Sequence, residues 1–266
     1  MNSSLVVVKD NKIIQASYKL TLVEQRIILS AIAKIDSTKA LNESQGFTIS
    51  VSEIHDLFME SKSSAYSEIK KAVNRLYRRS IILDGEGSER RWIYEKQYHE
   101  NKASVTLFFS PTIIPYLTQL KDSFTKYKLE YISEFRSSYS IRIYELLVQW
   151  TSKGEREIQI EDLKRILDVS DKYSRPANFI ARVIQPAIED INQSSNLHVS
   201  FGTRKSGRLI THIQFLFGIK AEVDQKKRIA PIKSTKLTME QFVRDNPKKT
   251  LGKSRDEVIK MMNNKH

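Results

Sequence analysis

The segment that decides the fold is KYSRPANFIARVIQPAIEDINQS, residues 172–194. Its apolar residues recur at steps of three and four, which is typical of a helix with one buried face. They are Phe179, Ile180, Val183, Ile184, Ala187, Ile188 and Ile191. We expect one long helix with Ser174 as its N-cap and with Pro176 in the first turn, where proline is tolerated.

The opposite side of this helix is polar and carries Arg175, Asn178, Arg182 and Gln185 at the same steps. Arginine forks and flat amides are the groups that donate to base edges in a DNA major groove. The segment therefore has two interpretations. It is a recognition helix, or it is an amphipathic helix whose polar face is only solvated, which is the commoner case. The rest of the chain has to decide between them.

Composition favours a polyanionic partner. The 266 residues carry a net charge of +13, which suits DNA, RNA or an anionic membrane surface. The chain has no cysteine, so disulfides and cysteine-based zinc sites are excluded. No apolar run approaches the 18 residues of a membrane span, and Leu5–Val8 is too short for a secretory signal. We expect a soluble, cytoplasmic protein without a membrane partner.

The first half of the chain alternates helices and strands in a definite order. Its expected elements are a helix over 18–35, a strand over 47–50, a helix over 53–60 capped by Ser52, a helix over 65–79, a strand over 81–83, a turn over 84–87, and returning strands over 91–98 and 104–109. This is the order of a winged helix, which is a helix-turn-helix with a β-hairpin attached. Residues 111–136 then form a connector that packs against the rest of the protein.

The same order repeats from residue 138 onward. The expected elements are a helix over 139–150 with Trp150 inside, a strand over 157–160, a helix over 161–169, the helix over 172–194, a strand over 197–201, a turn over 202–207, and a strand over 209–217. A shift of about 110 residues lays one half on the other. The fold class is therefore α+β, with two tandem winged-helix domains over 1–120 and 121–220.

Residues 221–266 form a basic tail that we expect to be partly disordered when alone. They hold 12 Lys and Arg against 6 Asp and Glu, so they carry +6 of the total charge. Short helices are predicted near 238–244 and 254–262. Leu251–Ser254 resembles the end of a phosphate-binding loop, but Pro247 stands where that loop needs a glycine.

The repeat assigns roles to particular residues. The second helix of a helix-turn-helix enters the major groove, so Arg175, Asn178 and Arg182 are the predicted base readers. Predicted phosphate contacts come from the start of that helix, from the tip of the following hairpin and from the equivalent helix of the first unit. These residues are Lys172, Tyr173 and Ser174; Arg204, Lys205 and Arg208; and Lys70, Lys71, Arg75 and Arg78. The alternative for the hairpin is a solvated basic turn.

Catalytic and metal-binding patterns are not found. The five histidines form no metal-binding spacing, although His198 and His212 could face each other across the second hairpin. We expect no metal, no cofactor and no catalytic residue.

Three stretches resemble a known family. Residues 16–26 (ASYKLTLVEQR), 139–147 (YSIRIYELL) and 179–192 (FIARVIQPAIEDIN) are similar to the Rep initiator proteins of iteron-containing, theta-replicating bacterial plasmids, of the RepB/RepE type. The resemblance spans about residues 5–220. It implies two winged-helix domains, of which the second reads the origin repeats, or iterons. The first contacts the DNA backbone and carries a dimer interface, with hairpin strands near Trp92–Tyr98 and Val105–Phe109 as candidates.

The resemblance also implies partners and regulation. Monomers would bind iterons and help to open the origin, whereas dimers would repress the initiator's own promoter. The host initiator DnaA and the replicative helicase would be protein partners.

Two rival functions remain at the sequence level. A winged-helix transcriptional regulator would show the same pattern, and a lone palindrome instead of tandem repeats near the gene would favour it. A nicking replication enzyme is the other, and a covalent protein–DNA adduct would establish it.

Overall fold

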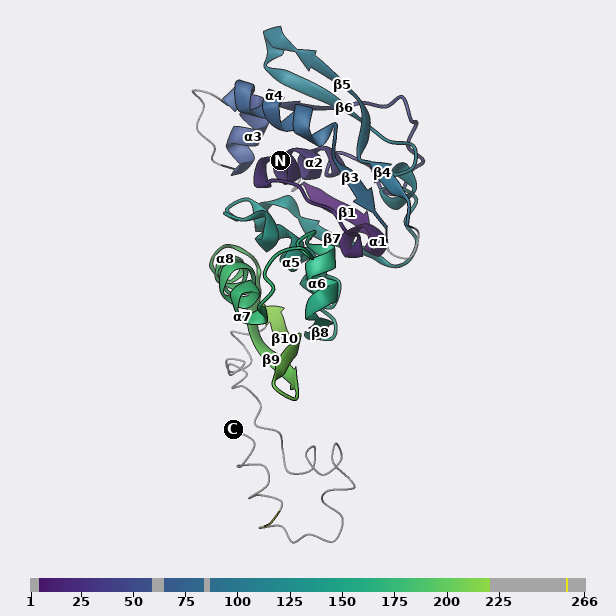
Figure 1. Ribbon diagram of the computed structural model, residues 1–266. Coiled ribbons are helices and arrows are strands. Elements are labelled where there is room, and N and C mark those ends of the chain that lie inside the picture. The colour runs from purple at the N-terminus through teal and green to yellow at the C-terminus, as the bar shows by residue number, and fades with distance from the viewer. Residues whose placement is uncertain (1–4, 59–64, 84–86, 221–256, 258–266) are drawn as a thin grey trace.

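The first half of the protein contains two helices packed as a helix-turn-helix beside two small sheets. The computed structural model describes residues 5–58, 65–83, 87–220 and 257 (Figure 1). The elements of this half are β1 (Val6–Asp10), α1 (Asn11–Gln15), α2 (Leu22–Ile32), β2 (Phe47–Ser50), α3 (Val51–Phe58), α4 (Ala65–Leu76), β3 (Ser80–Ile82), β4 (Glu89–Arg91), β5 (Ile93–His99) and β6 (Ser104–Phe109). Short 3-10 turns follow at Glu100–Lys102 and Ile114–Tyr116.

Local capping explains where the first long helix begins. Thr21 and Glu24 form a capping box: the Glu24 N–H donates to the Thr21 hydroxyl at 3.3 Å, and the Thr21 N–H donates to the Glu24 carboxylate at 2.9 Å. Helix α2 therefore starts at Leu22, four residues later than the sequence predicts. Helix α3 begins at Val51, so Ser52 lies inside it and is not its cap. The predicted turn over 84–87 lies largely outside the described residues.

The second half repeats the arrangement after a connecting strand. Its elements are β7 (Phe124–Lys128), a 3-10 turn (Leu129–Ile132), α5 (Ser138–Val148), β8 (Glu155–Gln159), α6 (Ile160–Ile166), α7 (Pro176–Phe179), a π-helical turn (Ile180–Ile184), α8 (Gln185–Ser194), β9 (Leu197–Ser206) and β10 (Leu209–Ile219). The apolar faces predicted for these helices are buried, except that Ile180 is partly buried and Trp150 is exposed. Its side chain lies beyond the end of α5, is 37% exposed and packs near Lys153 and Arg156.

The predicted hairpin turn over 202–207 is wrong. Strand β9 continues to Ser206, and Gly202 pairs with Gln214 in the sheet. Only Gly207 and Arg208 separate the strands, and Gly207 takes a positive φ of 62° that suits a residue without a side chain. The paired part of the hairpin is consequently longer than the sequence indicates, and the strands pair up to Ser206 and Leu209 at its basic tip.

Sheet topology confirms the internal repeat. The first unit has the strand order β2-β6-β5 and the second has β8-β10-β9, so in both the strand before the helix pair bonds to the last strand of the unit. Strands β3 and β4 form an additional two-stranded sheet in the first unit. The fold is α+β with two tandem winged-helix units, as predicted. The proposed basic tail and its helices lie outside the described residues.

A further sheet joins two strands that are far apart in the sequence. Strand β1 pairs antiparallel with β7, from Val6 opposite Lys128 to Asp10 opposite Phe124. In Figure 1 these strands lie between the upper and lower halves of the molecule. Their inward side chains, Val7 and Lys9 on β1 and Thr125 and Tyr127 on β7, are buried.

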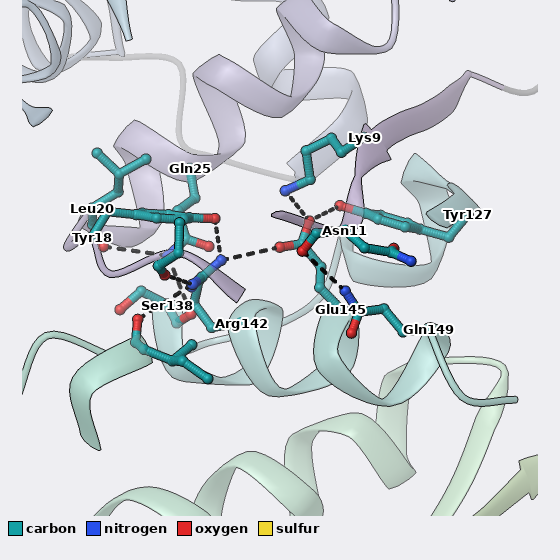
Figure 2. A network of polar contacts seen from close by, with 12 residues as sticks. Lys9, Asn11, Tyr18, Leu20, Gln25, Tyr127, Ser138, Arg142, Glu145 and Gln149 are labelled. Carbon is teal, nitrogen blue, oxygen red and sulfur yellow. Dashed lines mark hydrogen bonds and ion pairs between the residues drawn. The ribbon is translucent and has the colours of Figure 1, made fainter. Parts of the chain in front are cut away.

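A polar network fills this junction (Figure 2). The Lys9 ammonium lies 2.5 Å from the Glu145 carboxylate on α5, and the Tyr127 hydroxyl donates to the same oxygen at 2.6 Å. The Arg142 guanidinium lies over the Tyr18 ring at 3.6 Å and donates to the Ala16 carbonyl at 2.8 Å. Buried charges of this kind are stable only when paired, so the network fixes α5 against the start of the chain.

Candidate nucleic-acid interface

The helix at 176–194 begins one residue later than Ser174 predicts. Arg175 is the N-cap residue and makes no side-chain capping bond, while Pro176 takes the first helical position. Tyr173, just before it, adopts a left-handed φ of 55°, and its ring packs against Phe179 at a centroid distance of 5.9 Å. This contact, rather than a hydroxyl cap, orients the chain as it enters the helix.

The helix presents the two faces that the sequence predicts. Phe179, Val183, Ile184, Ala187, Ile188 and Ile191 are buried, and Ile180 is partly buried. Arg175, Asn178 and Arg182 are exposed, and their side chains make no hydrogen bond or ion pair with the described residues. Gln185 is also exposed, but its amide donates to Glu189 at 2.6 Å, so it is engaged within its own helix.

A π turn interrupts this helix at Ile180–Ile184, and sequence reasoning missed it. The backbone N–H of Gln185 donates to the carbonyl of Ile180, five residues back, instead of the usual four. Two signals in the sequence could have indicated it. The buried residues 179, 183, 187 and 191 follow a strict step of four, and Pro186 cannot donate a helical hydrogen bond.

The hairpin β9–β10 extends from the body of the molecule (Figure 1). Its tip carries basic residues. Lys205 and Arg208 at its tip are exposed and make no ion pair with any residue that the structure describes. Arg204 differs, because its guanidinium donates two hydrogen bonds to Glu157 on β8, at 3.0 and 2.8 Å. Arg204 therefore ties the hairpin to the sheet, while Lys205 and Arg208 remain available at the tip.

The basic helix of the first unit is largely neutralised by internal partners. Lys70 pairs with Glu100 at 2.6 Å, and Lys71 pairs with Glu68 at 2.9 Å. Arg75 and Arg79 donate to the fully buried carboxylate of Glu24, at 2.9 and 3.0 Å. Arg78 is exposed and has no ion pair within the described ranges. The phosphate contacts predicted for this helix stay a prediction, but three of its four predicted cations already have anionic partners.

Two family models match the chain. The one described as "Initiator Replication protein, WH1" matches residues 6–148, more than half of the sequence, and the one described as "Initiator Rep protein, WH2" matches residues 159–217. The chain belongs to the initiator replication protein family. The first matched region runs to the end of α5, and the second contains the helix with the unpaired arginines and most of the hairpin β9–β10.

Individual relatives agree with this assignment. A replication initiation protein of Escherichia coli is 27% identical over 268 residues, which cover 94% of this chain and 83% of the relative. The PI protein of Escherichia coli is 25% identical over an alignment of 240 residues, and the match covers 75% of this initiator and 78% of the relative. The crystal structure of Pi initiator protein in complex with iteron DNA matches with a TM-score of 0.72 at 23% identity, covering 83% and 99% of the two chains. This last likeness shows a shared fold.

Other candidate features of this initiator are not assembled by the fold. His198 pairs with Gly218 and His212 with Arg204, so the two histidines do not face each other across the hairpin, contrary to the sequence prediction. Among the described residues, no three His, Asp or Glu side chains gather as metal ligands. The described helices also include none that is long and apolar enough to cross a membrane. The loop at Leu251–Ser254 lies outside the described ranges.

Proposed function

We propose that this initiator binds the repeated origin DNA of a plasmid, the iterons, through the helix at 176–194 and thereby starts replication there. One observation carries the proposal. Arg175, Asn178 and Arg182 lie exposed on a helix whose other face is buried, and they have no partner among the described residues. The second helix of a helix-turn-helix is the element that enters the major groove.

The chemistry of these side chains fits base recognition. An arginine fork can donate to both O6 and N7 of guanine, and an asparagine amide can bond to N6 and N7 of adenine. Because the side chains make no internal ion pair, no protein contact has to break before they meet a base. Lys205 and Arg208 would contact flanking phosphates from the hairpin tip, which positions the protein without reading sequence.

The relatives support the choice of DNA partner. One relative is a replication initiation protein, and a protein of the same fold has been solved with iteron DNA. In this proposal the first unit contacts the DNA backbone and mediates dimer formation, and the dimer represses the initiator's own promoter. DnaA and the replicative helicase would join at the opened origin. Plasmid DNA lies in the cytoplasm, so the initiator would act there.

The protein would act by binding, without a catalytic step of its own. A covalent adduct between the protein and a supercoiled origin plasmid would contradict this part of the proposal. A single protected palindrome, in place of tandem direct repeats, would instead favour a transcriptional regulator.

Footprinting on the plasmid's noncoding DNA tests the function directly, and we expect protection of tandem repeats. A duplex with one protected repeat and a duplex of random sequence then serve for binding measurements. Arg182→Ala should cost about 1–3 kcal/mol on the repeat and much less on the random duplex. Lys126→Ala, which removes an exposed cation on β7, should affect both duplexes little. Equal losses on both duplexes for Arg182→Ala would refute base reading.

A further inference from the structure

The recognition helix contains one residue more than a regular α-helix would need. An α-helix turns about 100° per residue, so each step of four overshoots a full turn by about 40°. Three such steps separate Phe179 from Ile191, and in a regular α-helix these residues would point about 120° apart. Both are nevertheless fully buried on the same face. The π turn at Ile180–Ile184 absorbs the difference.

Removing one residue from the π turn restores an ordinary pattern. Without Ala181, the buried residues that follow Phe179 would come three, four, seven, eight and eleven positions after it. These are the spacings of an amphipathic α-helix. Ala181 is exposed and its side chain supports no contact in the core. The buried face therefore does not require the extra residue, and the reason for it must lie on the exposed face.

On the exposed face the extra residue changes what the turn presents. The π turn places two consecutive residues outward, Ala181 and Arg182, between the partly buried Ile180 and the buried Val183. A regular α-helical turn would have room for only one outward residue at this place. In a helix without the extra residue, Arg182 would therefore point closer to where Ala181 points now. Pro186 has no N–H and so donates no backbone hydrogen bond. It therefore does not favour the regular α-helical bonding pattern over the π turn.

We propose that the extra residue in the π turn sets the angle at which Arg182 leaves the helix, and so determines which base pair Arg182 reads. This rests on the proposed function. Two parallel hydrogen bonds to a guanine tolerate little displacement, because bonds of this kind need about 2.7–3.2 Å and good alignment. π turns inside α-helices are frequent at functional sites.

Deletion of Ala181 is the test. The deletion variant should unfold cooperatively and bind the random duplex with the same salt dependence as the wild type. The wild type should bind the protected repeat more tightly than versions of that repeat with one base pair changed. In the deletion variant, this preference should be roughly ten- to a hundredfold smaller. Ala181→Ser keeps the length of the helix and should keep the preference. Adding Arg182→Ala to the deletion should cause no further loss of preference.

Each outcome decides the matter. A deletion variant that folds and keeps the wild-type preference overturns the role of the π turn. A deletion variant that does not fold also overturns it, because the shorter helix was argued to bury the same face. If the wild type itself shows no preference, or Arg182→Ala keeps it, then base reading fails and this inference fails with it. Loss of preference in the deletion variant and in Arg182→Ala, but not in Ala181→Ser, supports both proposals.

Discussion

Replacing Glu145 by glutamine tests the polar network between α5 and strand β1. Glu145 is buried, and its carboxylate is 2.5 Å from the equally buried ammonium of Lys9. Lys9 has no other ion-pair partner among the residues described. Burial lowers the pKa of Lys9, and the neighbouring Glu145 limits that fall. Without the carboxylate, the pKa of Lys9 should fall much further.

The stability lost in Glu145→Gln depends on what happens to the charge of Lys9. Removing one member of a buried ion pair commonly costs about 3–5 kcal/mol. The alternative for Lys9 is to give up its proton. At about pH 7, neutralising a lysine with an ordinary pKa of 10.5 costs about 5 kcal/mol, at about 1.36 kcal/mol per pH unit. Glu145→Gln should therefore lower the free energy of unfolding by about 3–5 kcal/mol.

The proton on Lys9 also determines how the stability of Glu145→Gln changes with pH. In the variant, the folded state holds Lys9 neutral while the unfolded state still binds its proton below the ordinary pKa. Stability then rises with pH up to that pKa, so the deficit should shrink to about 1–2 kcal/mol near pH 9.5. Lys9→Met should cost less than Glu145→Gln, since Glu145 would keep the Tyr127 hydroxyl and Arg142, whose guanidinium lies 3.7 Å away.

Urea unfolding followed by circular dichroism at both pH values measures these differences. The double variant Lys9→Met with Glu145→Gln should cost clearly less than the sum of the single variants, because it removes the pair without leaving a lone charge. Additive single effects, or a deficit that grows with pH, would refute the reasoning.

Three further perturbations test other parts of the structure. Glu24→Gln should lower the free energy of unfolding in urea by about 1.5–3 kcal/mol, since two arginines donate to that buried carboxylate; an unchanged midpoint would contradict this. Lys205→Ala should flatten the salt dependence of binding by about one phosphate contact, and Arg204→Ala should flatten it less because of its bonds to Glu157; the reverse order would assign the phosphate contact to Arg204. Removing residues 221–266 should weaken binding to random DNA and reduce its salt slope, whereas an unchanged slope would show that the tail contacts no phosphate.

Local spacing was enough to predict most elements of the fold. The buried faces of α5, α6 and the 176–194 helix follow from the steps between apolar residues, and periodicity is a property of a single segment. The order of these segments then led to the winged-helix repeat, which the sheet topology confirms. The exposure of Arg175, Asn178 and Arg182 followed from the same periodicity.

Pairing across long sequence distances could not be predicted in this way. The basic face of α4 suggested free cations, but Glu24 neutralises Arg75 from a position 51 residues earlier in the chain. Arg204 is held by Glu157, 47 residues before it. Each carboxylate looks like a surface residue in its own segment. Only the folded chain brings the partners together, so local patterns could not show which cations are already paired within the protein.

The pairing of β1 with β7 has a consequence for the time at which the protein can fold during synthesis. Strand β1 is made well before its partner strand, which begins 114 residues after the last residue of β1. Lys9 has to wait longer still, because its counter-ion on α5 is made 136 residues later. At typical rates of about 5–20 residues per second, the ribosome needs roughly 7–27 s for those 136 residues. Throughout this time, the nascent first unit exposes an unpaired, valine-rich strand that can join other strand edges, so this stage of synthesis is where a chaperone would be most useful.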